Sequence, residues 1–183
     1  MAGIPATLPG FKSPAVGFEQ PFDMLLACHE RVHRTLGLLH RLLDHVEARG
    51  HDAQSRAAAA DVLRYFDIAA PLHHEDEELH VFPALAGHAD PRLMAAIGAL
   101  RRDHEHMVAC WAALRVGLVR WRDDPAAPLI DEGIRRAAQD FSGLYAAHIA
   151  TEENLVYPAA RACFDDVGLA RIGAEMQARR RAS

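Results

Sequence analysis

The most informative residues of this chain are His73-His74-Glu75-Asp76-Glu77, and a related stretch, His148-Ile149-Ala150-Thr151-Glu152, follows in the second half. Both contain a His-x-x-x-Glu, and the two copies lie 75 positions apart. Each copy is followed by an aromatic residue and a proline, Phe82-Pro83 and Tyr157-Pro158. One motif is therefore present twice in a single chain.

Each half of the chain also carries a lone histidine, His29 in the first half and His104 in the second. These two residues are again 75 positions apart, and each precedes its His-x-x-x-Glu by 44 residues. A solitary His-x-x-x-Glu arises easily by chance on an exposed helix. A doubled one at matching intervals is a specific signal.

The composition indicates a single domain without a basic surface. The chain has 183 residues, of which 50% are hydrophobic, and this is enough for a sizeable core. The net charge of −5 disfavours nucleic acid and membranes as partners, and we interpret the run Arg179–Arg181 as a solvated tail. The three cysteines are odd in number and far apart, which is typical of a reducing compartment, so we expect a cytoplasmic protein. We expect neither a signal peptide nor a membrane span.

Apolar residues recur at helical spacing along almost the whole chain, and no alternating strand pattern is present. The stripes predict helices from Phe22 to near Gly50, from Ser55 to Leu85, from Pro91 to before Asp123 and from Pro128 to Val156, with a short helix over 165–179. Pro71 is expected to kink the second helix, because its ring removes a backbone donor and crowds the preceding turn.

Short connections between long helices indicate antiparallel neighbours. We therefore predict an all-α fold, an up-down-up-down four-helix bundle over residues 21–162. An irregular arm rich in Pro and Gly precedes it over residues 1–20, and a short C-terminal helix with a basic tail follows over residues 163–183.

The repeated residues lie on the apolar stripes. His29 is seven positions from both Phe22 and Leu36, so it shares their helix face. The same spacing places His104 and His148 on the inner faces of their helices. Because residues four apart share a face, each His-x-x-x-Glu can direct both side chains to one point.

Six metal-ligating side chains are therefore expected to point into the core: His29, His73, Glu77, His104, His148 and Glu152. A buried carboxylate is costly unless it is paired or binds a metal ion. Imidazole and carboxylate ligands suit iron, manganese or zinc, and this set is larger than a tetrahedral zinc site needs. Two metal ions bridged by carboxylates fit it better than one.

The order and spacing of these residues resemble the hemerythrin-like, or HHE cation-binding, family. Its pattern, a lone histidine and a His-x-x-x-Glu repeated across four helices, is matched over about residues 22–160. The resemblance implies a non-haem di-iron site in a four-helix bundle. It also implies that Glu77 and Glu152 bridge the two irons and that the histidines complete each ligand set.

One departure from the family pattern concerns a fifth histidine. Oxygen-carrying hemerythrins have two histidine ligands four apart on the third helix, whereas Leu100 and Val108 stand four positions either side of His104. Three residues are candidates to fill this gap, and water is the alternative: His33, His74 and Tyr145.

The three candidates differ in what supports them. His33 shares a face with His29, but its counterpart in the repeat is Val108, so we interpret it as a helix-flank residue. Tyr145 is three positions before His148 and is expected to donate a supporting hydrogen bond rather than to bind a metal. A shift of register by one residue would make His74 and Glu78 the ligand pair, but the repeat argues against this shift.

Three functions remain open at the level of sequence. The first is a protein that binds or senses small oxidants (oxygen, nitric oxide or peroxide) or handles iron, as the family resemblance implies. The second is a di-iron enzyme that decomposes peroxide or repairs iron-containing centres, as in some relatives. A bundle with a structural metal ranks last, because structural sites are usually closed and rich in cysteine.

Overall fold

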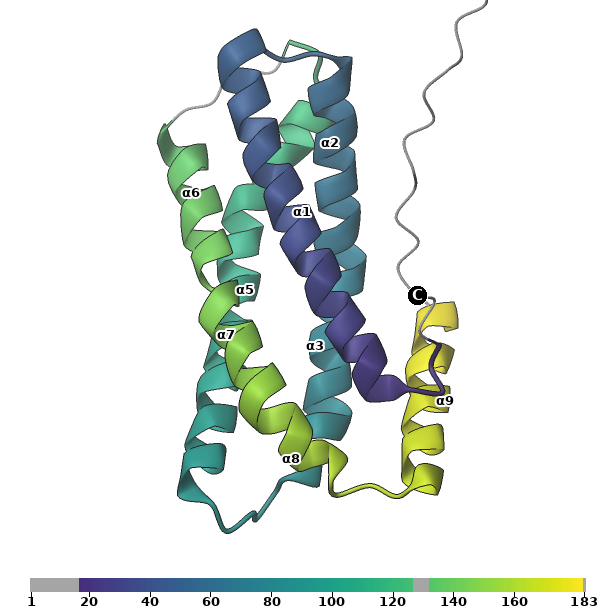
Figure 1. Ribbon diagram of the computed structural model, residues 1–183. Coiled ribbons are helices and arrows are strands. Elements are labelled where there is room, and N and C mark those ends of the chain that lie inside the picture. The colour runs from purple at the N-terminus through teal and green to yellow at the C-terminus, as the bar shows by residue number, and fades with distance from the viewer. Residues whose placement is uncertain (1–16, 127–131, 183) are drawn as a thin grey trace, which may run out of the picture.

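The computed structural model describes residues 17–126 and 132–182, and within these residues every regular element is helical (Figure 1). The elements are α1 (Pro21–Arg49), α2 (Ala53–Arg64), η1 (Tyr65–Ala69), α3 (Ala70–Asp76), η2 (Glu77–Val81), α4 (Phe82–Ala84), α5 (Pro91–Asp123), α6 (Glu132–Gly143), α7 (Tyr145–Thr151), η3 (Glu152–Val156), α8 (Tyr157–Arg161) and α9 (Asp166–Ala182). The three η segments are single turns of π-helix. The all-α prediction is confirmed for the described part of the chain.

These elements form long helical columns that lie side by side, with α9 outside them (Figure 1). The columns are α1, the continuous run from α2 to α4, α5, and the run from α6 to α8. The predicted start of the fourth helix near Pro128 lies outside the described residues, and α6 begins at Glu132. The fourth column is interrupted at Leu144, between α6 and α7.

Local sequence explains where two of the columns begin. The side chain of Asp52 accepts from the backbone N–H of Ser55, whose hydroxyl in turn accepts from the backbone N–H of Asp52, so α2 starts with a complete capping box. The side chain of Asp90 accepts from the N–H of Arg92, and Pro91 occupies the first turn of α5, where its missing N–H costs nothing.

Each π-turn ends directly before a residue that is followed by proline. The N–H groups of Ala70, Phe82 and Tyr157 reach back five residues instead of four, and the next residues are Pro71, Pro83 and Pro158. A proline inside a helix cannot donate and its ring crowds the carbonyl four residues earlier, so the preceding turn widens. The expected kink at Pro71 therefore takes the form of a π-turn.

Two apolar clusters fill the interior, and a polar layer separates them. Along α1, Val32 belongs to one cluster and Cys28 to the other, with His29 between them. Along α5, His104 lies in the same way between Leu100 and Met107. The histidines and glutamates of the repeat are therefore held in position by packed side chains on both sides.

Helix α9 packs against α1 at the lower end of the bundle (Figure 1). The helix also lies close to the segment before α1, and this approach requires Gly173. A Cβ at that position would stand 1.7 Å from the carbonyl oxygen of Phe18. The interpretation of Arg179–Arg181 as a solvated tail is wrong for two of these residues. Arg179 and Arg180 belong to α9 and bind the fully buried carboxylate of Asp76, with an Nη2–Oδ2 distance of 2.6 Å for Arg180.

No described helix is both long enough and apolar enough to cross a membrane.

Candidate metal centre

Every helical column contributes to one buried cluster of ligand-type side chains. All six residues that the sequence singled out lie in it, and none is more than 7% exposed: His29 on α1, His73 on α3, Glu77 on η2, His104 on α5, His148 on α7 and Glu152 on η3. Their ligand atoms form two overlapping sets, and within each set all atoms lie within 4.8 Å of one another. Both sets contain Glu77 and Glu152.

Glu77 directs its two oxygens to different histidines. Oε1 lies 3.5 Å from Nε2 of His73, which is four residues earlier on the same column. Oε2 lies 3.4 Å from Nε2 of His104, on α5. The carboxylate therefore stands between one histidine of each set.

Glu152 is arranged in the same way. Its Oε2 lies 3.2 Å from Nε2 of His29, and its Oε1 lies 3.0 Å from Nε2 of His148. The 75-residue repeat of the sequence is thus a repeat in space, with one shared carboxylate contributed by each half. Glu77 and Glu152 are also the first residues of the π-turns η2 and η3.

The inner faces of this cluster lack hydrogen-bond partners among the described residues. Six fully buried atoms are left unsatisfied: Nδ1 of His73, Oε2 of Glu77, Nε2 of His104, Nε2 of His148 and both carboxylate oxygens of Glu152. Buried polar atoms are nearly always satisfied, and leaving one without a partner costs about 1–3 kcal/mol. Five of these atoms are the ones that would face a metal ion, so the residues fit a metal centre.

The pKa values of the two buried carboxyl groups are shifted in opposite directions. Burial, together with the neighbouring charge of Glu152, raises the pKa of Glu77 to about 7. Burial alone would also raise the pKa of Glu152, but the neighbouring imidazoles of His148 and His29 hold it well below its ordinary value. Burial lowers the pKa of His73 strongly, so its imidazole is neutral and able to bind a metal.

Carboxylates outside the cluster orient three of the histidines. Each accepts from, or lies within hydrogen-bond reach of, a ring Nδ1: Glu153 Oε1 at 2.8 Å from His29, Glu78 Oε1 at 3.2 Å from His104, and Asp103 Oδ2 at 3.3 Å from His148. Such contacts fix the ring and turn Nε2 toward a metal. Glu78 and Glu153 are again 75 positions apart, so the repeat extends to these supporting residues.

Comparison with known proteins agrees with this geometry. The profile of the hemerythrin HHE cation-binding domain matches residues 20–160. The chain belongs to the hemerythrin HHE cation-binding family. It is also 36% identical, over 163 residues, to an uncharacterized protein of Haemophilus influenzae (strain ATCC 51907 / DSM 11121 / KW20 / Rd), and the match covers 89% of this chain and 91% of that protein.

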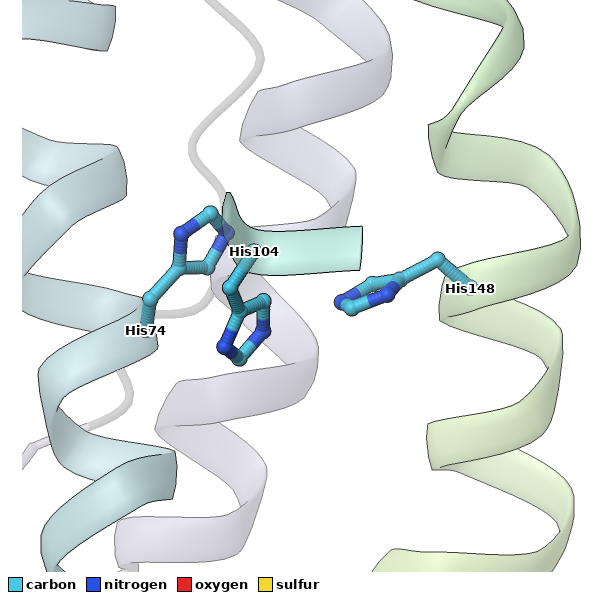
Figure 2. A group of neighbouring side chains, drawn as sticks. All are labelled: His74, His104 and His148. Carbon is cyan, nitrogen blue, oxygen red and sulfur yellow. The ribbon is translucent and has the colours of Figure 1, made fainter. Parts of the chain in front are cut away.

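His74 brings a fifth histidine to this HHE centre. Its ring lies parallel to that of His104, with centroids 4.1 Å apart, and its ligand atoms form a further set with those of His104 and His148 (Figure 2). Glu78 is not in any of the three sets, so the register shift that would pair it with His74 does not occur. The predicted pair, His73 and Glu77, is the one that lies inside the cluster.

The other two candidates for a fifth ligand lie elsewhere. His33 is exposed on α1 and is in none of the ligand sets. Tyr145 is buried, but its ring packs against Phe66 and Phe141, with centroids 6.0 Å and 5.3 Å away. No hydrogen bond joins its hydroxyl to a histidine or glutamate of the HHE centre in the described structure.

Tyr157 is a member of the site that sequence reasoning did not single out. Its hydroxyl donates to Oε1 of Glu77 and lies 3.2 Å from Nε2 of His29, and its ring stacks on His29 with centroids 5.5 Å apart. Its counterpart in the repeat, Phe82, stacks on His104 in the same way but has no hydroxyl. The signal was present in the aromatic-Pro pairs, where one half of the HHE repeat has Tyr and the other has Phe.

Proposed function

We propose that this protein is a non-haem di-iron protein that binds or senses small oxidants, or handles iron itself. In this proposal His29 and His73 hold one iron, His104 and His148 hold the other, and Glu77 and Glu152 bridge the pair. Bound iron would supply the binding or the electron transfer that oxygen, nitric oxide and peroxide require.

The observation that carries the proposal is that the two oxygens of each glutamate face histidines of different ligand sets. A single metal ion would draw both oxygens of a carboxylate, or only one, to one point. Here Glu77 and Glu152 each turn one oxygen toward each set, at distances of 3.0–3.5 Å from the nearest histidine nitrogens. This arrangement supports two ions and two bridges.

His74 is the best-placed residue for the fifth histidine ligand. It lies beside His104 and His148, so the proposed ligand division is two histidines on one side and three on the other. Burial lowers the pKa of His74 to about 3, and its imidazole is therefore neutral, as a ligand must be. The side with two histidines would then keep more positions for water or an oxidant.

Tyr157 supports a second candidate function, an enzyme that decomposes peroxide. Its hydroxyl holds a proton beside Glu77 and His29, on the side with two histidines. Burial, reinforced by the two carboxylates, keeps the pKa of Tyr157 well above its ordinary value. A phenol that stays protonated at this position can donate a hydrogen bond to an oxygen atom of a substrate.

Two broader inferences accompany the function. The cysteines Cys28, Cys110 and Cys163 are all free, which supports a reducing, cytoplasmic setting. The three-residue connection Gly50–Asp52 between α1 and α2, and the course of the columns in Figure 1, support the up-down-up-down order of an antiparallel four-helix bundle.

Reconstitution of the full-length chain with ferrous iron under anaerobic conditions tests the proposal. Metal analysis is expected to give about two irons per chain. Exposure to oxygen, nitric oxide or peroxide is then expected to change the optical spectrum. Glu77→Ala and Glu152→Ala should each abolish the spectrum of the iron pair, and the matched control His33→Ala should retain it. One iron per chain, or zinc retained in preference to iron, would contradict the di-iron assignment.

A further inference from the structure

A cavity of about 690 Å³ opens beside the candidate metal centre, and His74 and His104 form part of its wall. It lies between the column that contains η1 and α3 and the helix α5, with Phe141 and Tyr145 contributing from the fourth column. A diatomic gas needs roughly the space of one water molecule, about 30 Å³, whereas sites for organic ligands measure about 300–1,000 Å³. The cavity is therefore much larger than a small oxidant requires.

The interior of the cavity is mainly apolar. Phe66, Met107 and Phe141 are buried and line it, and the indole of Trp111 stands beside them. Asp67 fixes that indole, because its Oδ1 accepts from Nε1 of Trp111 at 2.9 Å. An aromatic wall held in this way is already shaped in the absence of a ligand, which lowers the entropic cost of binding.

Charged groups at the cavity are largely paired with one another. Arg115 binds Asp67 at 2.9 Å, and Arg101 binds Glu78 at 3.1 Å. These ion pairs offset the charges of both arginines with those of Asp67 and Glu78, and the rest of the lining is mainly apolar. The lining therefore favours an uncharged ligand over a charged one.

Tyr145 adds a polar group to this apolar wall. The residue is only 3% exposed, it lines the cavity, and its hydroxyl makes no hydrogen bond to any described residue. A hydroxyl in a mainly apolar wall gains a hydrogen bond when a bound ligand supplies an acceptor. A ligand oxygen that accepts a hydrogen bond would satisfy it.

We propose that this cavity binds an uncharged, mainly apolar organic molecule with one hydrogen-bond-accepting oxygen, which contacts the hydroxyl of Tyr145 and extends toward His74. The proposal rests on the proposed function only in that the bound molecule would lie beside the metal centre. Binding itself depends on the aromatic wall, on Tyr145 and on the volume of the cavity.

Calorimetric titration of the iron-loaded, full-length protein with methyl ketones of increasing length, from 2-pentanone to 2-nonanone, tests this inference. Affinity is expected to rise about fourfold per added methylene group as apolar surface is buried. The carboxylate and the alkylammonium ion of matching length are expected to bind at least tenfold more weakly than the ketone. Equal affinity for ketone and carboxylate, or no dependence on length, would overturn the proposal.

Two neighbouring alanines on α5 provide a matched pair of variants. Both residues are exposed. Ala112 lines the cavity, whereas Ala113 does not. Ala112→Phe is expected to weaken ketone binding about tenfold or more, and Ala113→Phe is expected to leave it unchanged. Equal effects of the two variants would contradict the assignment. So would a dimer of the protein that Ala112→Phe dissociates, because the mouth would then be covered by a second copy.

Tyr145→Phe tests the polar contact separately. The variant keeps the ring and is expected to lose about fivefold in affinity for the ketone but nothing for the 1-chloroalkane of equal length. The iron content measured on the same samples separates the two proposals. Ketone binding without two irons would contradict only the proposed function, and two irons without ketone binding would contradict only this inference.

Discussion

The hydroxyl of Tyr157 on α8 donates a hydrogen bond to Oε1 of Glu77 on η2, although the two residues are 80 positions apart in the chain. The contact is fully buried and joins two helical columns at the shared carboxylate. Phe82 occupies the equivalent position in the other half, so this contact makes the two halves of the repeat chemically different.

Tyr157→Phe is expected to lower the free energy of unfolding by about 1–3 kcal/mol, because Oε1 of the fully buried Glu77 loses its donor. Urea unfolding measures the change. The iron content should remain at the wild-type value, since the variant removes no proposed ligand, while the optical spectrum should shift. Tyr145→Phe is the matched control, because its hydroxyl has no hydrogen bond within the described structure. An equal loss of stability in both variants would show that the contact with Glu77 contributes nothing.

His74→Ala is expected to change the spectrum of the iron-loaded protein and to reduce the retained iron, because the set with His104 and His148 loses a nitrogen. His33→Ala serves as the control, since His33 is exposed. Metal analysis after gel filtration distinguishes the two. Retention of two irons with an unchanged spectrum in His74→Ala would mean that water takes the fifth position.

Glu78→Gln and Glu153→Gln are each expected to weaken iron affinity about 10–100-fold, because each removes the carboxylate that orients a histidine through Nδ1. Competition with a chelator of known affinity provides the measurement. Glu105→Gln is a suitable control: Glu105 follows His104 directly in the sequence but is exposed. The prediction fails if Glu105→Gln releases iron as readily as the other two variants.

Removal of the metal is expected to lower the melting temperature. A ligand that binds only the folded state stabilises it, by about 2.7 kcal/mol at a concentration 100 times the dissociation constant. Without metal, Glu77 and Glu152 and their unsatisfied neighbours remain crowded in an apolar interior. Calorimetry before and after chelation checks this effect, and an unchanged melting temperature would indicate a peripheral and weakly held metal.

The double variant Arg179→Ala/Arg180→Ala is expected to lower the free energy of unfolding by about 3 kcal/mol, because it leaves the buried Asp76 carboxylate without its two cations. Arg181→Ala is the control, since Arg181 is exposed at the end of α9. Thermal and urea unfolding give the comparison. If the double variant were as stable as Arg181→Ala, the ion pairs with Asp76 would contribute nothing and Arg179 and Arg180 would behave as a solvated tail.

Periodicity in the sequence was enough to predict the helices and to place six residues on their inner faces: His29, His73, Glu77, His104, His148 and Glu152. Helical periodicity is a local property, and a residue seven positions from two core leucines or phenylalanines shares their face whatever the neighbouring helix is. The repeated aromatic-Pro pairs were visible in the sequence, but only the structure showed that a π-turn precedes each of them.

The positions of His74, Tyr157 and Arg179 depend on contacts between helices that are distant in the chain. Adjacent residues on a helix point about 100° apart, so periodicity assigns only one of His73 and His74 to the core. The cluster is wide enough for two sets of ligands, and His74 reaches the second set because α5 and α7 lie beside it. The hydrogen bond of Tyr157 and the ion pair of Arg179 with Asp76 join residues 80 and 103 positions apart, and no local pattern specifies which columns become neighbours.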